Sequence, residues 1–553
     1  MTSKQKSLVG GVSILAVAGI ICKLVGVLYR IPLANTVGGV GLGVYSKVFQ
    51  SYNLLLTVSS AGIPVAISRT VSFYTTRNDP RTAKRVFKIA LLALTVLGLI
   101  TTVLMIAGSG ILSKWVKSPE TKAGYIAIAP SLLLVCVMSA FRGYMQGHRK
   151  MVPTAVSQLI EQVGKLAVAL PLAVIGTNRG GPAYGAAGML LGTSAAEAVA
   201  LAYMVFTHYR CKAEFASIEQ DPGAEMPSDK KIGWDLLAIA VPITIGACIV
   251  PLAGWIDSLM VTQLMEGNGI TGLALEGVEN AAELLHEEAM TRYGLYSSVV
   301  LSLINVPTAI AMAVSSNLVP DISSGIARGD REYVAKESLM GLRIAAVVGL
   351  PCSVGMSVLA RPILYMLYLG KYTPAQLDIA AQVLELSALT IILFTMVQAT
   401  SGILQGCGKQ RIPMYTLAAG VACKVGLNFL LIGNPDINIH GAPIASLVCY
   451  SVSMIPNLFF VKKYTGCKMD VSAIVLRPLA ATLVMGGAVY ALWRFIFTDK
   501  ALDSRLLTAV GVVVCLVIGI IVFAVCAFAF KAIRAEDLPG KLGRKLKKIK
   551  FLS

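Results

Sequence analysis

The chain has 553 residues, of which 56% are hydrophobic and only 14% are charged, and its net charge is +19. Soluble domains average about 25% charged residues, so the composition excludes a soluble enzyme or binding domain and predicts a polytopic membrane protein. The excess of Lys and Arg then indicates basic loops that face anionic lipid on the inner side of a membrane, rather than a nucleic-acid partner.

Apolar windows of about 20 residues, the length that crosses a bilayer, predict fourteen transmembrane helices. They lie near 8–33, 42–68, 88–112, 123–141, 152–176, 184–207, 234–263, 293–322, 338–368, 375–400, 412–433, 440–461, 472–496 and 503–530. The first window lacks a small-residue cleavage site, so we interpret it as a membrane helix and not as a signal peptide. With a cytoplasmic N-terminus, 32 of the 48 Lys and Arg residues fall on the inside and nine on the outside. This asymmetry predicts that both termini are cytoplasmic.

The chain also contains an internal repeat. The segment "GYMQG" at 143–147 recurs as "GILQG" at 402–406, 259 residues later, and Lys165 recurs as Lys424 at the same spacing. Each copy holds six predicted helices, an even number, so the two copies cross the membrane in the same direction. The repeat therefore predicts two parallel six-helix bundles related by a pseudo-two-fold axis along the membrane normal, as in transporters that open alternately to each side.

The predicted fold is an all-α polytopic membrane protein in which two further helices follow the two bundles. The expected parts are an N-terminal bundle (1–208), a cytoplasmic linker (209–233), a C-terminal bundle (234–462), helices 13 and 14 (463–530) and a basic cytoplasmic tail (531–553). The tail sequence "KLGRKLKKIK" is typical of a segment that lies on anionic lipid. We expect a monomer in the bacterial cytoplasmic membrane.

Ionised side chains inside the bilayer are costly, which makes them candidate functional groups. Five of the cations are candidates for binding a substrate headgroup in a central cleft: Lys23, Arg30, Lys47, Lys165 and Lys424. Four carboxylates are candidates for ion coupling or structural pairing: Glu161, Glu197, Asp257 and Glu385. Because the cations, with Arg361 and Arg477, outnumber the carboxylates, the pattern favours an anionic headgroup such as a diphosphate.

Glu161 and Lys165 are four residues apart on a predicted helix, so they share a face and can form an ion pair. Such a pair either orders the bundle or leaves Lys165 in contact with substrate, and the residues alone leave both roles open. Lys424 has no carboxylate neighbour in sequence.

Cofactor motifs are not found in the sequence. "GCGKQ" at 406–410 lacks the spacing of a phosphate-binding loop, so we expect no ATP site and transport driven by H+, Na+ or the membrane potential. The four His and eleven Cys residues show no zinc-like spacing, and we expect neither a metal nor an enzymatic activity.

Three stretches carry a resemblance to a known family: "GLGVYSKVFQSYNLLLTVSSAGIPVAISRTVSFY", "GYMQGHRKMVPTAVSQLIEQVGKL" and "LVPDISSGIARGD". They resemble the stage V sporulation protein B branch of polysaccharide-exporter flippases, in the superfamily that includes the MATE multidrug transporters and the lipid II flippase MurJ. The resemblance covers nearly the whole chain. It implies export of a lipid-linked glycan, with the undecaprenyl-diphosphate-linked peptidoglycan precursor lipid II as the expected substrate.

The resemblance also implies a headgroup site formed by cations of helices 1, 2 and 8. Lys23 and Arg30 lie in the matching part of helix 1, and Lys47 lies in helix 2. The eighth helix, "YSSVVLSLINVPTAIAMA", departs from the family because it has no basic residue. We expect Lys165 and Lys424 to compensate.

Two alternative functions stay open. A MATE-type ion-coupled multidrug exporter would share the fold, but a site for cationic drugs favours surplus carboxylate. A membrane-embedded glycosyltransferase or polymerase would require carboxylates or metal ligands on outer loops, and the acidic loop at 264–292 is the one candidate.

Overall fold

The computed structural model describes residues 3–216, 227–271, 273, 279–467 and 469–533, and for some helical residues, Lys23 among them, it describes the backbone alone. These residues are almost entirely helical. The α-helices are α1 (Ser3–Ser60), α2 (Ile63–Thr76), α3 (Pro80–Ala107), α4 (Ser109–Trp115), α5 (Thr121–Gly147), α6 (Val152–Gly164), α7 (Leu170–Ala216), α8 (Asp229–Asn268), α9 (Ala281–Gly294), α10 (Leu301–Ala327), α11 (Arg331–Val358), α12 (Ala360–Tyr368), α13 (Pro374–Ala388), α14 (Thr390–Gly406), α15 (Arg411–Ile432), α16 (Gly441–Thr465), α17 (Arg477–Leu492) and α18 (Arg505–Ala529). Wider π-helical turns occupy η1 (Lys165–Ala169), η2 (Leu295–Val300), η4 (Ser472–Leu476) and η5 (Trp493–Phe497), and tighter 3-10 turns occupy η3 (Asn438–His440) and η6 (Asp499–Asp503).

The candidate membrane-spanning segments are fewer and longer than predicted. Twelve segments of the described chain are long and apolar enough to cross a membrane. The 58-residue α1 contains the predicted helix near 8–33 and most of the one near 42–68, whose last residues lie in α2. The run from α6 through η1 to α7 passes through the predicted helices near 152–176 and 184–207. The number of fourteen crossings, and the side on which the termini lie, therefore stay predictions.

Two glycines break these long helices. A straight 58-residue helix would measure about 87 Å, far more than the roughly 30 Å of a bilayer core. Gly38 (φ 70°, ψ −175°) and Gly181 (φ 80°, ψ −171°) interrupt the helical path. This backbone region is accessible almost only to glycine, so each glycine provides the turn between two successive predicted helices.

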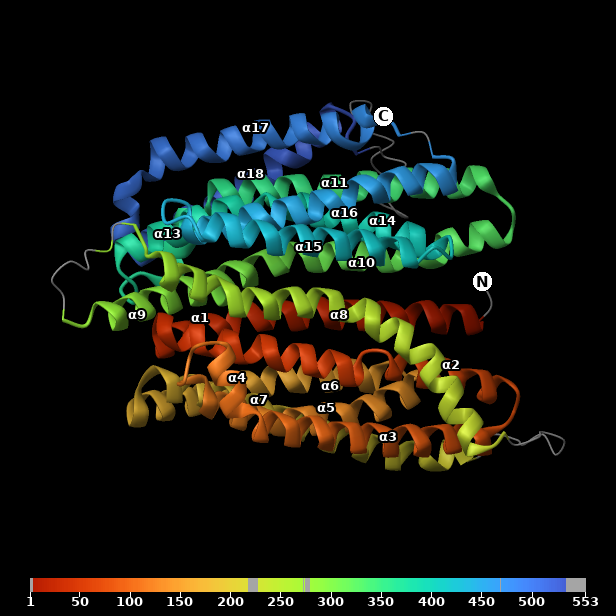
Figure 1. Cartoon of the computed structure of the whole chain (residues 1–553). Coiled ribbons are helices and arrows are strands. Elements are labelled where there is room, and N and C mark those ends of the chain that lie inside the picture. Colours follow the sequence, from red (N-terminus) through yellow and green to blue (C-terminus); the bar gives the residue numbers. More distant parts are fainter. Residues whose placement is uncertain (1–2, 217–226, 272, 274–278, 468, 534–553) are drawn as a thin grey trace. The chain divides into compact units, whose positions relative to one another are not determined.

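The chain divides into two compact units. Unit 1 comprises Met1–Glu266 and Ala274–Ser298, and unit 2 comprises Gly267–Leu273 and Val299–Ser553. Within unit 1, α5 packs against α3 and α7, and α1 packs against α7, as Figure 1 shows for the helices coloured red to yellow. By their contacts α9 and all but the last two residues of α8 fall in unit 1, whereas the repeat assigns both helices to the second bundle. The bundle boundaries drawn from the repeat stay a prediction.

The repeated glycines perform the same packing task in each unit. In unit 1, Gly143 and Gly147 of α5 lie against α2, and a Cβ atom at Gly143 would be 2.8 Å from the carbonyl oxygen of Pro64. In unit 2, Gly402 and Gly406 of α14 lie equally close to α10, where a Cβ atom at Gly402 would be 2.7 Å from a backbone oxygen. Any larger side chain would force these helices apart.

The turns after these glycines are also alike. Arg149 and Gly408 adopt left-handed backbone conformations, with φ values of 61° and 71°. The amide that follows each donates to the carbonyl five residues before it, at 2.9 Å in the first copy and 2.8 Å in the second. This is the hydrogen-bond pattern of a Schellman helix end, and its recurrence supports a true duplication of sequence and structure.

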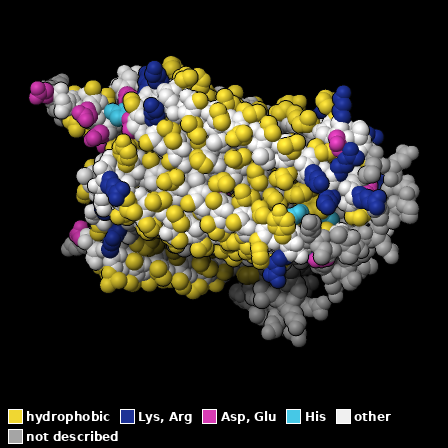
Figure 2. Space-filling model, turned by 90° about the horizontal axis from the view of Figure 1, so that it is seen from below, with side chains coloured by type: hydrophobic (Ala, Val, Ile, Leu, Met, Phe, Trp, Pro, Cys, Tyr) yellow, Lys and Arg dark blue, Asp and Glu magenta, His cyan; other side chains and the backbone are white. Residues whose placement is uncertain are grey.

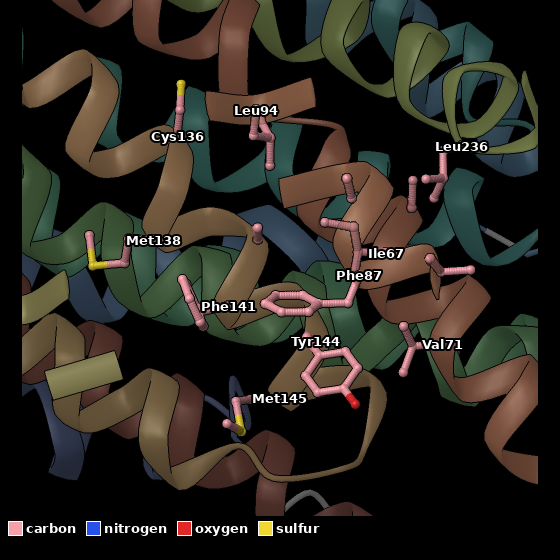
Figure 3. Packing of buried hydrophobic residues seen from close by; sticks show 14 of the residues in the cluster. Ile67, Val71, Phe87, Leu94, Cys136, Met138, Phe141, Tyr144, Met145 and Leu236 are labelled. Atoms are coloured by element: carbon pink, nitrogen blue, oxygen red, sulfur yellow. The ribbon is translucent and has the colours of Figure 1, made fainter. Parts of the chain in front are cut away.

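A hydrophobic core holds α2, α3, α5 and α8 together near the end of unit 1 that carries the 148–151 turn (Figure 3). Phe87 of α3 lies between Phe141 and Tyr144 of α5, with ring centroids 5.2 and 4.6 Å apart. Ile67 of α2 and Leu236 of α8 enclose the same cluster. Such packing fixes α5, which carries one of the charged side chains described below.

The surface has the polarity that a bilayer requires. Figure 2 shows a broad band of hydrophobic side chains on one face of the molecule, with Lys and Arg gathered towards its ends. Among the exposed apolar residues are Leu92, Leu99 and Leu104 of α3. An exposed apolar band of this extent is favourable against lipid and unfavourable against water.

Candidate functional site

A triad of charges lies inside unit 1. The carboxylate of Glu161 on α6 accepts a hydrogen bond from Arg142 Nη2 of α5 at 2.9 Å, and its other oxygen lies 3.6 Å from Lys165 Nζ. The predicted pairing of Glu161 with Lys165 is therefore present. The predicted helix near 123–141 ends before Arg142, but α5 continues to Gly147 and carries the Arg142 side chain within unit 1. Arg142 also donates to Ser157 Oγ at 3.0 Å.

A π-helical turn begins at Lys165. A Cβ atom at Gly164 would lie 2.9 Å from that of Ala196, and one at Gly192 would lie 2.3 Å from Cα of Ala169. The α6–η1 segment therefore lies directly on α7, and no side chain larger than glycine fits at these two points. Such turns are uncommon and are frequently found at functional sites. Here the turn places Lys165 next to the residues of α7.

Glu197 of α7 lies behind the triad. Its side chain is 2% exposed, and its Oε1 accepts a hydrogen bond from the Tyr52 hydroxyl at 3.2 Å. Its Oε2 atom has no hydrogen-bond partner among the described residues. Nearby, Ser131 and Ser194 are joined by a 2.9 Å hydrogen bond between their hydroxyls. The carboxyl group of Glu197 is thus buried with one of its two oxygens unsatisfied.

Arg30 of α1 belongs to the same interior. Its Nη1 donates to the carbonyl of Ser298 at 3.4 Å, and the hydroxyls of Tyr29 and Tyr45 lie within its reach. We call the group formed by Arg30, Tyr52, Arg142, Glu161, Lys165 and Glu197 the polar track of unit 1. The other cation predicted in helix 1, Lys23, lies outside the described side chains.

The structure gives Lys47 a different environment from the one expected of a headgroup ligand. Its side chain is fully buried, and its Nζ donates to the carbonyl of Val116 at 2.9 Å. The negative charges of Glu266 and Glu120 act on it. In this conformation Lys47 fastens α1 to the segment between α4 and α5, and its predicted contact with a substrate would require that segment to move.

Close to Lys47, a histidine joins three segments of unit 1. His286 of α9 contacts Glu266 of α8 through Nδ1 at 2.9 Å and Glu120, at the start of α5, through Nε2 at 3.0 Å. A neutral imidazole can donate from one nitrogen alone, so two carboxylate partners require a doubly protonated ring. Burial by itself would raise the pKa of Glu120, but hydrogen bonds from His286, from Ser118 and from the backbone lower it to about 2.

Replacing His286 by Ala is expected to lower the free energy of unfolding at pH 7 by about 2 kcal/mol, since hydrogen bonds to charged groups contribute about 1.5–3 kcal/mol. The pKa of Glu120 is depressed from 4.5 to about 2. Its stabilising contribution is therefore complete above pH 4.5 and disappears as the pH falls towards 2. Unfolding in detergent at several pH values measures this effect. His440→Ala, which removes a neutral contact to Gln382, should show no comparable loss. Equal stability of His286→Ala and wild type at pH 7 would contradict a stabilising role for the contacts of His286 with Glu120 and Glu266.

The remaining predicted residues lie elsewhere. Asp257 is buried on α8 in unit 1. Lys424 is partly buried on α15, and Glu385 is exposed on α13, both in unit 2. The structure thus brings Arg30, Lys165, Glu161 and Glu197 into one unit, and it adds Arg142, Tyr52 and His286, to which the sequence pattern assigned no role.

Comparisons with known proteins agree with this architecture. A family model described as "Polysaccharide biosynthesis protein" matches residues 8–325, and one described as "Lipid II flippase MurJ" matches residues 282–529. The lipid II flippase MurJ of Bacillus subtilis (strain 168) is 25% identical over 564 residues, which cover 99% of this chain and 98% of that protein. Stage V sporulation protein B of the same organism is 26% identical over 442 residues, 80% of this chain and 81% of that protein. A solved structure of lipid II flippase MurJ in an inward closed conformation has a TM-score of 0.69 at 13% identity, over 93% of this chain and 98% of that one. This last likeness shows a shared, all-helical membrane fold.

Proposed function

Because the chain belongs to the polysaccharide biosynthesis family of the MATE–MurJ flippase superfamily, we propose that it moves an undecaprenyl-diphosphate-linked glycan from the inner to the outer leaflet. The chain is a multi-pass protein of the cell membrane. Both family matches describe proteins that handle polysaccharide or lipid-linked precursors. We take lipid II as the substrate, with transport by alternating access.

The observation that carries the proposal is the surplus of positive charge in the polar track of unit 1. Arg142 and Lys165 share the single carboxylate of Glu161, and Arg30 adds a third cation from α1. The polar track thus holds three cations and two carboxylates, and this positive balance favours an anionic ligand. A diphosphate, with several acceptor oxygens, matches such a set of Lys and Arg donors.

We propose the membrane potential as a driving force for such a substrate. Moving one elementary charge across the membrane corresponds to about 2.3 kcal/mol per 100 mV. A diphosphate-linked lipid carries negative charge outward, the direction that an inside-negative potential favours. The carboxylates Glu161, Glu197, Asp257 and Glu385 remain the candidates for coupling H+ or Na+ to this movement. We further propose that the protein acts as a monomer and that its basic tail, outside the described residues, contacts anionic lipid.

Flipping in reconstituted vesicles tests the proposal. A fluorescent undecaprenyl-diphosphate disaccharide is placed in both leaflets, and its exchange is followed by quenching from outside. We expect wild-type protein to expose the inner pool and Lys165→Met to lose this activity. Lys122→Met, on an exposed residue at the start of α5, is the matched control and should flip normally.

The same vesicles separate the alternatives. Efflux of a cationic dye without lipid flipping would overturn the proposal in favour of a MATE-type multidrug exporter. Formation of a polymerised or glycosylated product from the labelled lipid by purified protein would favour a membrane-embedded glycosyltransferase.

A further inference from the structure

Glu197 has a carboxyl group that the protein encloses almost completely. Its side chain is 2% exposed, Tyr52 donates to its Oε1 at 3.2 Å, and its Oε2 has no hydrogen-bond partner among the described residues. Burying an ionised carboxylate with so few hydrogen bonds is unfavourable unless a positive charge lies nearby. The charge of Glu197 must therefore depend closely on its neighbours.

Those neighbours come from each segment that packs against α7. Tyr52 lies on α1, Ser131 on α5, Glu161 on α6 and Lys165 on η1, and all four act on the Glu197 carboxyl group. Of these groups, Lys165 alone carries a positive charge. It makes no ion pair with Glu197 among the described residues, because its ammonium lies closer to Glu161, at 3.6 Å.

Lys165 can leave Glu161 without leaving that carboxylate unpaired. Arg142 holds Glu161 at the shorter distance of 2.9 Å and is itself anchored by Ser157. Lys165 is thus the more weakly held cation of the triad. The three side chains of the triad are 13–15% exposed, so a ligand has an edge to contact, whereas the buried Glu197 admits little more than a proton.

We propose, building on the proposed function, that Glu197 takes up one proton when the diphosphate of the substrate binds Lys165. The diphosphate oxygens engage the ammonium of Lys165, and its charge no longer supports the ionised carboxylate of Glu197. An O–H bond then forms at Oε2 with a proton drawn from the aqueous phase, where a buffer acid is converted into its conjugate base. No other bond is made or broken.

The proposal has a consequence for the direction of coupling. Linkage is reciprocal, so a proton on Glu197 strengthens diphosphate binding as much as the diphosphate strengthens proton binding. Proton and substrate therefore bind together rather than in competition. A proton on Glu197 also removes a negative charge that would repel the diphosphate. In this proposal the membrane potential acting on the substrate drives transport, and the proton on Glu197 raises the affinity for the diphosphate.

Proton exchange during ligand binding tests the proposal. Purified full-length protein in weakly buffered detergent at pH 7.5–8.5 is titrated with undecaprenyl diphosphate while a pH dye records protons taken up and a separate assay records binding. We expect uptake of about one proton per ligand bound in the wild type, and an affinity that falls by up to about tenfold per pH unit, as for one linked proton. Glu197→Gln mimics the neutral acid and should bind the ligand without this uptake. The difference between the two proteins removes the proton exchange of the diphosphate itself.

Two further variants show whether a loss of proton uptake comes from a general disturbance of the protein. Lys165→Met keeps Glu197 but lacks the linking charge, so any residual ligand binding should occur without proton uptake. Glu332→Gln, an exposed carboxylate of α11, should behave as wild type. Proton uptake by Glu197→Gln equal to that of wild type would overturn this inference and leave the proposed function intact. Ligand binding by wild type that is independent of pH would do the same. If wild type binds no undecaprenyl diphosphate at all, the proposed function fails as well.

Discussion

Replacing Glu161 by Gln is expected to lower the free energy of unfolding by about 3–5 kcal/mol, the loss that follows when one partner of a buried ion pair is removed. Glu161 is the one carboxylate that both Arg142 and Lys165 contact. The substitution keeps the shape of the side chain and removes its charge, so two cations would remain in a largely buried site. Unfolding in mixed detergent micelles measures the loss.

Removing the cations together with the carboxylate should reverse most of this effect. A triple variant, Arg142→Met with Glu161→Leu and Lys165→Met, replaces the triad by apolar side chains, and such replacements are often neutral or stabilising by about 1–4 kcal/mol. We expect it to unfold near the wild type and to fail in transport. If Glu161→Gln is as stable as wild type, or if the triple variant is less stable than Glu161→Gln, the triad is not the stabilising element described here.

Sequence patterns predicted two members of the triad and missed the third. The spacing of four residues correctly placed Glu161 and Lys165 on one face, because that relation depends only on helix geometry. The apolar window near 123–141 left Arg142 outside the predicted helix, whereas α5 continues to Gly147. Helix ends are the least certain part of such a prediction, and here one end decides the charge balance of the site.

Contacts between residues far apart in the sequence could not be predicted, for a different reason. Lys47 contacts a carbonyl 69 residues away, and His286 contacts carboxylates 20 and 166 residues away. The periodicity of a sequence segment does not indicate such pairs, since they depend on how helices pack after they form. The four His residues appeared scattered along the chain, yet the fold places His286 between Glu120 and Glu266.

Glycine was the more informative residue for the fold. The repeated glycines at 143–147 and 402–406 marked the duplication, and the structure gives them a shared task in helix packing. Gly38 and Gly181, in contrast, lie between apolar windows, where a loop was expected. They form sharp breaks inside continuous helical runs, at Gly181 together with the non-helical Gly180, because glycine at positive φ can redirect a helix without a loop.

Replacing Arg30 by Ala is expected to reduce lipid flipping by about a hundredfold, since the loss of charge-assisted hydrogen bonds to a diphosphate corresponds to about 3 kcal/mol, and each 1.36 kcal/mol is a factor of ten in rate. The vesicle assay measures the rate, and proteolysis of exposed loops checks that the variant inserts normally. Arg179→Ala, at an exposed residue of α7, removes the same charge from the surface and should leave flipping intact.

Arg30→Lys separates the two roles that the structure allows for this residue. Arg30 donates to the Ser298 carbonyl and lies beside the hydroxyls of Tyr29 and Tyr45, so it could act by ordering α1 rather than by binding substrate. Lys retains the charge but not the planar fork of donors. If Arg30 binds the diphosphate, Arg30→Lys should flip lipid faster than Arg30→Ala, because the charge attraction remains. The flipping rate of Arg30→Lys should then fall as the salt concentration rises, because salt screens this attraction. If Arg30 only orders α1, Arg30→Lys should lose thermal stability together with activity. Normal flipping by Arg30→Ala would remove Arg30 from the headgroup site, leaving Lys165 and Arg142 as the cations of the polar track.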